Sequence, residues 1–273
     1  MSTPIPWPVP EPELPADVHP ALAAVARAAH RAYGEARRRH TRAELGTETA
    51  MGADGTPTML VDRLVEDAVA EAARAAGANL LSEEAGFLDN GSAVTLVVDP
   101  VDGSANAAAG VPLSCIAAVV SVDGTATEAL TCWFDTGRSW HAVAGRPTPY
   151  RTSGRTRLDG AALNVLRPRP AGRDAWHRLT DRAARIRILS TTCLEGALVA
   201  EGSIDAFADA GGDVHRIMDL AAAMVTVPAA GGAVIDAFGR PLEIDPDLTR
   251  RWSGIIAATP RLAEEIAAAV TAG

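Results

Sequence analysis

The chain contains no lysine and no glutamine, and only 4% of its 273 residues are aromatic. All 25 basic residues are therefore arginine, set against 34 acidic residues, which gives a formal net charge of −9. A negative chain lacks the basic face that non-specific binding to nucleic acid or to acidic membranes requires, so neither partner is expected. The acidic excess suits a site that collects cations.

Cysteine and long apolar runs are also scarce. Cys115, Cys132 and Cys193 form no CxxC pair and no Cys–His cluster, and three cysteines make no even disulfide framework. A reducing compartment is the simplest reading, so we expect a cytoplasmic protein. No apolar run reaches about 18 residues, which excludes a membrane-spanning helix. The N-terminus lacks a basic flank followed by an apolar stretch, so no signal peptide is expected.

What the chain does have is enough apolar sequence for a large core, with 48% hydrophobic and 22% charged residues. Residues 1–20 are rich in proline and predict an extended or disordered leader. Helical and strand patterns then mix without strict βαβ alternation, which indicates an α+β fold of stacked layers. A Gly-, Pro- and Arg-rich junction near residue 150 divides an N-terminal subdomain, 21–150, from a C-terminal subdomain, 151–273.

Local patterns predict the main elements. A helix is expected over about 21–39, followed by a mobile Gly/Thr/Asp-rich loop over 46–58. Thr56 as cap and Pro57 as first helical residue predict a second helix that reaches about Gly77. Further strands are expected at 94–98, 116–122, 126–134, 162–166 and 186–190, with a hairpin turn at Asp123-Gly124, and further helices at 192–201, from about Met218, and over 260–271.

The most informative run is DPVDGS, from Asp99 to Ser104, directly after an apolar strand. Two carboxylates at the end of a buried strand are costly unless something compensates them. Asp-Pro and Asp-Gly are also ordinary turn dipeptides, and this run alone leaves that alternative open. A hard metal would explain both acids, since Asp99 and Asp102 can face one point and the Val101 carbonyl offers a further oxygen. Gly103 then lets backbone N–H groups approach an anion.

Three further acids strengthen the metal hypothesis. Glu83 and Glu84 follow another strand-like end at Leu80-Leu81, and Asp219 begins an alanine-rich helix. Adjacent loop acids are usually only solvated, and an acid in a first helical turn is often only a complement to the helix dipole. Three acidic element ends in one chain are nevertheless explained most simply by one shared site. Ligands that are all oxygen favour Mg²⁺ over Zn²⁺.

Together these motifs resemble the inositol monophosphatase family of lithium-sensitive, metal-dependent sugar phosphatases. The stretches at 52–58 (GADGTPT), 82–84 (SEE) and 89–92 (DNGS) resemble its archaeal-type branch, whose members often cleave both inositol phosphate and fructose 1,6-bisphosphate. The resemblance covers about residues 20–270. It implies the layered αβαβα sandwich of the sugar phosphatases and, as is common in the family, a homodimer.

The resemblance also implies the metal ligands, with two or three Mg²⁺ in the site. The ligand set would be Glu83, Asp99 and the Val101 carbonyl for one metal, and Asp99, Asp102 and Asp219 for a second. Glu84 would be a secondary acid close by, and Asp54 would help to hold a third, weaker metal.

The remaining implied roles concern catalysis and substrate. Asp62 and Ser104 would orient and deprotonate the attacking water, with Glu83 counted among the catalytic residues. The amides of Gly103 and Ser104 would hold the phosphate. Substrate-side contacts, on a looser alignment, would be Arg187, Glu195, Asp209 and Arg216. Ala107–Ala109 replace a usually aromatic position and its neighbours, which predicts a wider pocket.

The function implied is hydrolysis of a phosphate monoester of a small polyol or sugar by metal-activated water. Two alternatives stay open at this point. One is a phosphatase of 3′-nucleotides or of specialised metabolites on the same scaffold. The other is a catalytically silent homologue that binds a phosphorylated ligand.

Overall fold

The computed structural model describes residues 3–272, which form two large sheets and a separate two-stranded hairpin, with helices around the large sheets. The elements up to residue 143 are α1 (Pro20–Arg39), α2 (Arg42–Leu45), β1 (Glu48–Met51), β2 (Pro57–Met59), α3 (Leu60–Ala75), β3 (Asn79–Ser82), β4 (Gly86–Leu88), β5 (Val94–Asp102), α4 (Ser104–Ala109), β6 (Cys115–Val122), β7 (Thr125–Trp133) and β8 (Ser139–Val143).

The second part of the chain supplies the other sheet and most of the remaining helices. Its elements are β9 (Ala162–Val165), a short 3₁₀ helix (Pro170–Gly172), α5 (Arg173–Thr180), β10 (Arg185–Arg187), α6 (Thr192–Ala200), β11 (Ala206–Ala208), α7 (Ile217–Ala229), β12 (Ala233–Asp236), β13 (Gly254–Ala257) and α8 (Pro260–Thr271).

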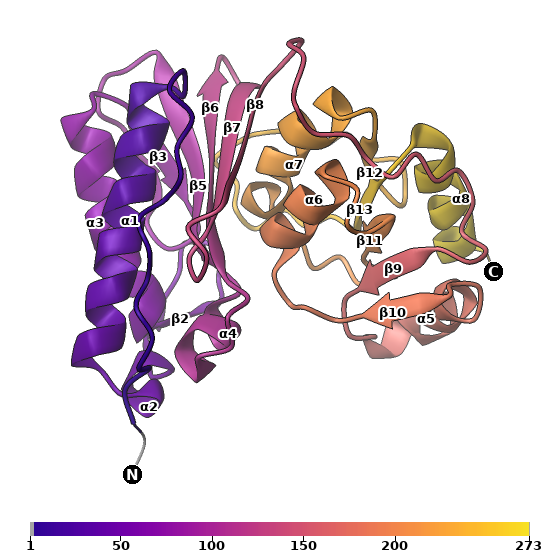
Figure 1. Cartoon of the computed structure of the whole chain (residues 1–273), viewed down its shortest axis with the longest axis horizontal. Helices are drawn as coiled ribbons and strands as arrows, with labels where there is room; N and C mark the ends of the chain where they lie inside the picture. The colour runs from indigo at the N-terminus through magenta and orange to yellow at the C-terminus, as the bar shows by residue number, and fades with distance from the viewer. Residues whose placement is uncertain (1–2, 273) are drawn as a thin grey trace.

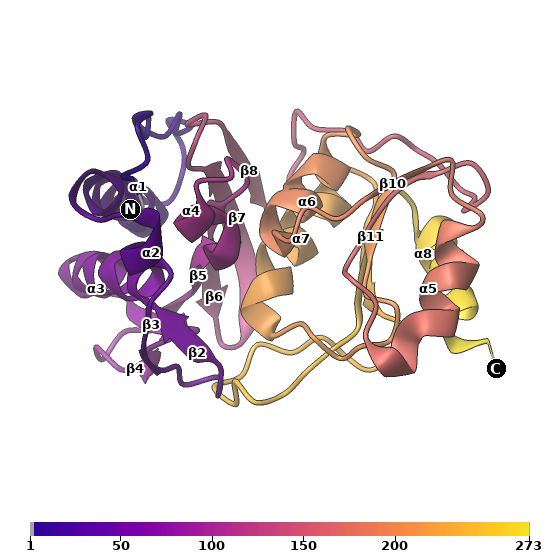
Figure 2. The ribbon, with the colours of Figure 1, turned by 90° about the horizontal axis from the view of Figure 1, so that it is seen from below.

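These elements stack as five layers of helix and sheet (Figure 1). Helices α1 and α3 cover the outer face of a six-stranded sheet with the order β4-β3-β5-β6-β7-β8. Helices α6 and α7 lie between this sheet and a five-stranded sheet with the order β10-β9-β11-β13-β12, and α5 and α8 cover the far side (Figure 2). The predicted αβαβα sandwich is confirmed. The boundary between subdomains near residue 150 stays a prediction.

The outer helix α1 shows why the sequence builds this stack. Its apolar stripe, which includes Leu22, Val25, Ala29 and Tyr33, is buried against the first sheet and α3. Residues spaced three or four apart share one helix face, so the stripe can be covered by a single neighbouring layer. Helix α7 differs because it faces sheets on both sides. Met218 on α7 joins the cluster with the first sheet, whereas Leu220 joins the cluster with the second.

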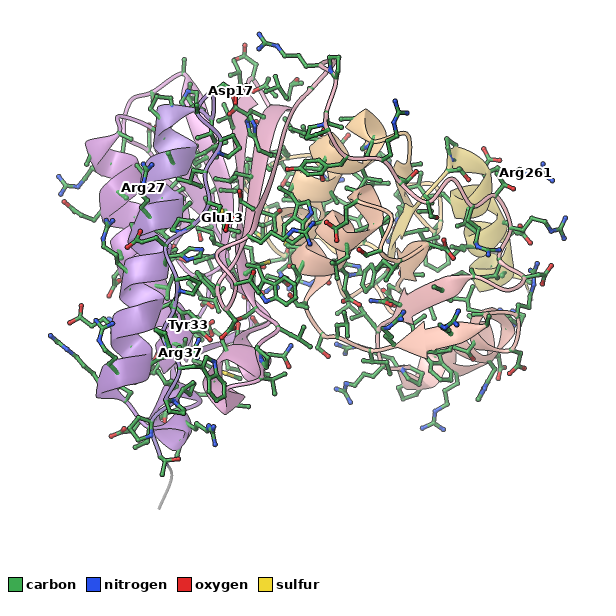
Figure 3. All side chains as sticks on the ribbon, viewed as in Figure 1. Glu13, Asp17, Arg27, Tyr33, Arg37 and Arg261 are labelled. Carbon is green, nitrogen blue, oxygen red and sulfur yellow. The ribbon has the colours of Figure 1, made fainter. Side chains whose placement is uncertain are left out.

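The proline-rich leader is ordered over its described residues, 3–19, and lies along α1 and the first sheet. Ile5 is buried in the core, and the indole of Trp7 donates to Asp135 at 2.9 Å. Asp135 also accepts a hydrogen bond at 2.7 Å from Arg37 of α1, which Figure 3 labels. Over residues 3–19 the leader is therefore extended, which was one of the two expectations, and the first two residues lie outside the described part of the chain.

The expectation for residues 46–58 is wrong. Strands β1 and β2 form an antiparallel hairpin there instead of a mobile loop. Pro57 is a strand residue, and α3 begins three residues later at Leu60. Thr56 does not cap that helix but donates to Asp54 at 2.8 Å. The sequence rule failed because a Thr-Pro pair suits a strand end as well as a helix start.

The other predicted elements are present with shifted ends. The turn at Asp123-Gly124 is confirmed, with φ of 49° and 74° at the two residues, the left-handed values that a tight hairpin requires. The predicted strand at 186–190 is shorter, since β10 covers Arg185–Arg187. None of the described helices is long and apolar enough to cross a membrane.

Candidate active site

Glu83 and Asp99 are neighbours because of how the first sheet is built. Strand β3 pairs in parallel with β5, and Ser82 lies opposite Val98. The residues that follow this pair, Glu83 and Asp99, therefore leave the same edge of the sheet. The register of β5 against β6 shifts between Asp99 and Asp102, where Pro100 has no N–H to donate to a ladder. Both aspartates of the DPVDGS run are buried there.

Asp102 joins the first sheet to the middle helix layer. Its Oδ2 accepts hydrogen bonds from the backbone N–H groups of Cys193 and Leu194, at 3.0 and 3.3 Å, in the first turn of α6. The hydroxyl of Thr191 donates to the same oxygen, and the Cys115 thiol lies 3.5 Å from it. The carboxylate thus acts as an acceptor for the free N–H groups of a helix start, which favours its ionised form.

Arg216 occupies the centre of the acidic cluster. It is the N-cap of α7, and its backbone N–H donates to Asp219 at 2.7 Å. Its guanidinium donates to three carboxylates from three elements, namely Asp219 at 2.9 Å, Asp54 at 2.8 Å and Glu83. A partly buried cation with three carboxylate partners compensates charges that would otherwise repel one another.

The β1–β2 hairpin brings Asp54 to the same place and contacts Glu84, which follows β3. The Thr58 hydroxyl donates to Glu84, and Asp54 is buried. Gly52 allows this approach, because a Cβ at that position would lie 2.6 Å from a carboxylate oxygen of Glu84 and 3.0 Å from Asp54. The hairpin is therefore fitted to the acidic cluster rather than folded independently of it.

A cavity of about 350 Å³ opens over these residues. Its wall includes Asp62, Glu83, Asp102, Gly103, Ser104, Arg216 and Asp219. Gly103 begins α4 with φ of +85°, and a Cβ there would meet the Leu113 carbonyl at 2.7 Å, so only glycine fits. The hydroxyl of Ser104 donates to the Val101 carbonyl at 3.0 Å. The predicted phosphate-contacting residues thus share one cavity with four of the predicted acids, Asp62, Glu83, Asp102 and Asp219.

Burial dominates the electrostatics of the cluster. It raises the pKa of Glu83 to about 8 and that of Asp102 to about 6, and it raises the pKa of Asp99 well above its usual range. Repulsion between the acids adds to each rise, while Arg216 opposes it at Glu83 and Asp99. At Asp219 burial acts the same way, but the adjacent Arg216 outweighs it and lowers the pKa. Such shifts are typical of sites that need a further cation.

Asp62 is placed apart from this cluster, in the first turn of α3. One carboxylate oxygen accepts from the Met59 backbone N–H at 3.1 Å, and the other is buried without a hydrogen-bond partner. Burial raises the pKa of Asp62 to about 7, against a smaller lowering by the Ser104 hydroxyl. A carboxyl group with a free oxygen and a pKa near neutrality can accept a proton at physiological pH.

The donor set fits a hard metal ion. The ligand atoms of Asp99, Asp102 and Cys193 lie within 4.8 Å of one another, and Glu83 and Asp219 line the adjoining cavity. The Cys193 thiol is buried in an apolar cluster and donates to the Asp219 carbonyl at 3.4 Å, and burial raises its pKa well above the usual value, which favours the protonated thiol. The remaining donors are oxygen atoms, which Mg²⁺ prefers.

Of the four residues predicted to contact the substrate, one lines the cavity and three lie elsewhere. Arg216 lines the cavity. Arg187 lies exposed on the edge strand β10, Glu195 is fully buried and accepts from Asn164 at 3.0 Å, and Asp209 accepts from the backbone N–H of Gly212 at 2.9 Å. These three do not line the cavity, and their role in substrate binding stays a prediction.

The wider pocket expected at Ala107–Ala109 is not seen. Ala107 and Ala108 are buried in the core beneath α4, and Ala105 is the alanine of this helix that lines the cavity. Small side chains at 107 and 108 therefore change the packing on the core side of α4. They do not widen the space beside the predicted phosphate position.

Thr192 and His215 line the cavity although neither was predicted as a site residue. They lie 3.3 Å apart, hydroxyl to Nε2. His215 Nδ1 accepts from the Gly254 backbone N–H at 3.1 Å, which leaves Nε2 as the protonated nitrogen of a neutral ring. Burial lowers the pKa of this histidine and so favours that neutral form. Thr192 and Glu195 match a helix-start pattern, but no local sequence pattern places His215 at the cavity.

Comparison with known proteins assigns this fold and site to a class. The profile of the Inositol monophosphatase family matches residues 19–272, so the chain belongs to that family. Within it, the chain groups with the archaeal-type branch, as its motifs predicted. A protein named fructose-1,6-bisphosphatase/inositol-1-monophosphatase from Thermococcus kodakarensis is 31% identical over 229 residues, covering 81% of this chain and 86% of that protein. One of the same name from Methanothermobacter thermautotrophicus is 32% identical, covering 81% and 88%.

Solved structures support the same fold. A protein from Pyrococcus horikoshii, described as similar to inositol-1 monophosphatase, superposes with a TM-score of 0.71 at 25% identity and covers 83% of this chain and 88% of its own. The extragenic suppressor protein suhB from Bartonella henselae superposes with a TM-score of 0.76 at 22% identity, covering 93% and 98%.

Proposed function

We propose that the chain is a Mg²⁺-dependent phosphatase that hydrolyses a phosphate monoester of a small polyol or sugar, such as inositol phosphate or a sugar phosphate or bisphosphate. One observation carries the proposal. Carboxylates from separate elements, the buried Asp102 and Asp219 and the partly buried Glu83, converge on a single cavity whose wall also contains Gly103 and Ser104. The names of the archaeal relatives support the same chemistry and substrate class.

The carboxylates would share the metal ions as the family pattern implies. Glu83, Asp99 and the Val101 carbonyl would hold one ion, and Asp99, Asp102 and Asp219 a second, with Glu84 and Asp54 near a third. When bound, Mg²⁺ supplies positive charge to the phosphate and lowers the pKa of water. The buried acids suit this role because their mutual repulsion falls when a cation is present.

Ser104 and Asp62 would orient the attacking water and take up its proton. The unpaired oxygen of Asp62 is available as the acceptor, and its pKa of about 7 allows it to be ionised before the reaction and protonated after it. Ser104 has a single proton and now donates it to Val101, so its lone pairs can accept from water. The N–H groups of Gly103 and Ser104 would hold the phosphate oxygens at the start of α4.

The rest of the cavity wall favours a polyol over a nucleotide. It includes Met59, Leu166, Ser190 and Thr192. Among the described residues, the one aromatic ring in this wall is the imidazole of His215, which is buried and fixed by its own hydrogen bonds, so it offers little surface for stacking a nucleobase.

Three further parts of the proposal follow the family pattern. We expect inhibition by Li⁺, assembly as a homodimer and a cytoplasmic location. The three cysteines are all buried and unpaired, which suits a reducing compartment.

A comparison of kcat/KM among three substrates tests the proposal. The substrates are inositol 1-phosphate, fructose 1,6-bisphosphate and 3′-phosphoadenosine 5′-phosphate, each with Mg²⁺. We expect one of the first two to be preferred. A preference for the nucleotide by more than tenfold, about 1.4 kcal/mol, would support the 3′-nucleotide alternative. No phosphate release from any of the three would support a silent phosphoryl-binding homologue or a specialised substrate outside the panel.

A further inference from the structure

The proline-rich leader is fastened to the first sheet and its helices at separate places. It runs beside α1 to α2 (Figure 1), where Pro4 forms an antiparallel bridge with Thr41, the N-cap of α2. Nearer to α1, the Glu13 backbone N–H donates to the Gly137 carbonyl at 2.7 Å, in the turn between β7 and β8. Residues 3–18 precede the part of the chain that the family profile matches, so the shared fold does not account for these contacts.

Ile5 of the leader packs on the C-terminal end of α4. Its side chain is 4% exposed and belongs to the same core cluster as Ala107 and Ala108 of that helix. A Cβ built on Gly110, the C-cap of α4, would lie 3.1 Å from Cγ1 of Ile5 and 3.3 Å from its Cδ1. Gly110 also has a φ of +74°, in the left-handed region that favours glycine. The turn that ends α4 is therefore shaped to receive Ile5.

Helix α4 has few atoms of its own that hold it in the core. It spans six residues, Ser104–Ala109, and its buried residues are two alanines. A helix this short is not stable by itself, so its position depends on the groups that pack around it. Asn106 provides one attachment, because its side-chain amide donates to the carbonyls of Leu113 and Leu189 at 2.9 and 2.8 Å. The leader provides another attachment at the C-terminal turn.

The opposite end of α4 lies in the candidate active site, where Ser104 lines the cavity. An α-helix rises about 1.5 Å per residue, so Ser104 and Gly110 are only about 9 Å apart along the axis. The start of the helix has little room to move. A Cβ on Gly103 would lie 2.7 Å from the Leu113 carbonyl oxygen and 3.2 Å from Cβ of Thr191. A displacement at the C-terminal turn would therefore change the position of the Ser104 hydroxyl.

We propose that Ile5 is a positioning residue for the hydrolysis, which acts through α4 to hold Ser104 where it can orient the attacking water with Asp62. This rests on the proposed function, which gives Ser104 that role. Ile5 is not part of the cavity wall, so its effect on the reaction passes through the helix. The prolines on both sides of Ile5 restrict the leader before it packs, which lowers the entropy cost of holding it in place.

The kinetic test uses three variants, saturating Mg²⁺, and the ester that the wild type hydrolyses fastest, at a temperature at which all are folded. Ile5→Ala should lower kcat about tenfold or more, since a displacement of about 1 Å can cost about 100-fold. Ile5→Val keeps Cγ1, the carbon nearest to Gly110, and should stay within about threefold of the wild type. Val9→Ala is the matched control, because this leader residue packs on Gly34 of α1, and it should stay within about twofold. Equal losses in Ile5→Ala and Val9→Ala, or no loss in Ile5→Ala, would overturn the proposal.

Amide hydrogen exchange in EDTA separates this proposal from the proposed function. The Gly110 N–H donates to the Ala107 carbonyl at 3.2 Å, and it should exchange about tenfold faster or more in Ile5→Ala but not in Val9→Ala. If the wild type hydrolyses no ester and exchange rises only in Ile5→Ala, the function fails and the seating of α4 by Ile5 stands. If the wild type hydrolyses an ester and Ile5→Ala matches it in rate or in exchange, only the positioning role fails. If there is neither hydrolysis nor a change in exchange, both fail.

Discussion

The Oδ2 atom of Asp102 accepts a hydrogen bond from the backbone N–H of Cys193 at 3.0 Å, so the last residue of β5 holds the first turn of α6. Asp102 therefore has a structural task besides the metal binding proposed for it. It fixes the start of a middle-layer helix against the edge of the first sheet at which the acids gather.

This double task predicts different results for two substitutions of Asp102. Asp102→Ala removes the acceptor for several buried donors and should lower the free energy of unfolding by about 1–3 kcal/mol. Asp102→Asn keeps one oxygen for those donors and should cost less than about 1 kcal/mol. Both should lower kcat about 100-fold or more, because each removes a metal ligand. Denaturant unfolding in EDTA measures the free energy of unfolding of both variants. Equal losses for Asp102→Ala and Asp102→Asn would show that the hydrogen bond from Cys193 contributes little.

Arg216 compensates the acidic cluster in the absence of metal. Its removal should therefore lower the stability of the metal-free protein but raise its affinity for Mg²⁺. Arg216→Gln should lower stability in EDTA, by about 3–5 kcal/mol, because Glu83 and Asp219 lose their cation. The same change should tighten Mg²⁺ binding about tenfold, since a positive charge beside the metal position is gone. Thermal melts with and without Mg²⁺ and a calorimetric Mg²⁺ titration measure the two effects. Weaker Mg²⁺ binding in the variant would mean that Arg216 orients the ligands instead of competing with the ion.

Ser104 is expected to act on water rather than as a nucleophile. Ser104→Ala should reduce kcat by roughly 10²–10⁴-fold, the range of general acid–base assistance, and Ser104→Thr should stay near the wild type because the hydroxyl is kept. Steady-state rates on a single substrate give both values. Rapid acid quench followed by mass spectrometry provides the opposing test, since a phosphorylated Ser104 would refute attack by water.

The pKa of Glu195 predicts a pH dependence of stability. Burial raises it to about 8 in the folded protein, against hydrogen bonds from Asn164 and from the Thr191 backbone that lower it. The folded state keeps a proton that the unfolded chain releases near its ordinary pKa of 4.5. This contribution is fully present below pH 4.5 and is lost as the pH rises through about 8.

Glu195→Gln imitates the protonated form and provides the measurement. In EDTA it should melt within about 2 °C of the wild type at pH 4 and above the wild type at pH 9. Glu264→Gln, on the exposed face of α8, is the control and should leave the pH profile unchanged. Parallel profiles for the wild type and Glu195→Gln would show that Glu195 is already ionised in the folded protein.

The sequence revealed the parts of the site that depend on local pattern. Asp99 and Asp102 follow an apolar strand within one short motif, and Asp219 begins a clear helix, so their positions at element ends could be predicted. The hairpin at 48–59 could not, because β1 is exposed along its length and shows no alternation of buried and exposed residues. The contacts of Arg216 with Asp54 and Glu83 span more than 130 residues, and no local pattern encodes them.

The central claim is that the carboxylates gathered at the sheet edge drive phosphate-ester hydrolysis through bound Mg²⁺. The most direct measurement is the initial rate of phosphate release from fructose 1,6-bisphosphate as a function of Mg²⁺ concentration, for the wild type and Asp219→Asn side by side. The account predicts a wild-type rate that saturates with Mg²⁺ and vanishes in EDTA, and a variant that is slower by about 100-fold or more and needs more Mg²⁺. Undiminished wild-type activity in EDTA, or equal Mg²⁺ curves for the two proteins, would contradict it.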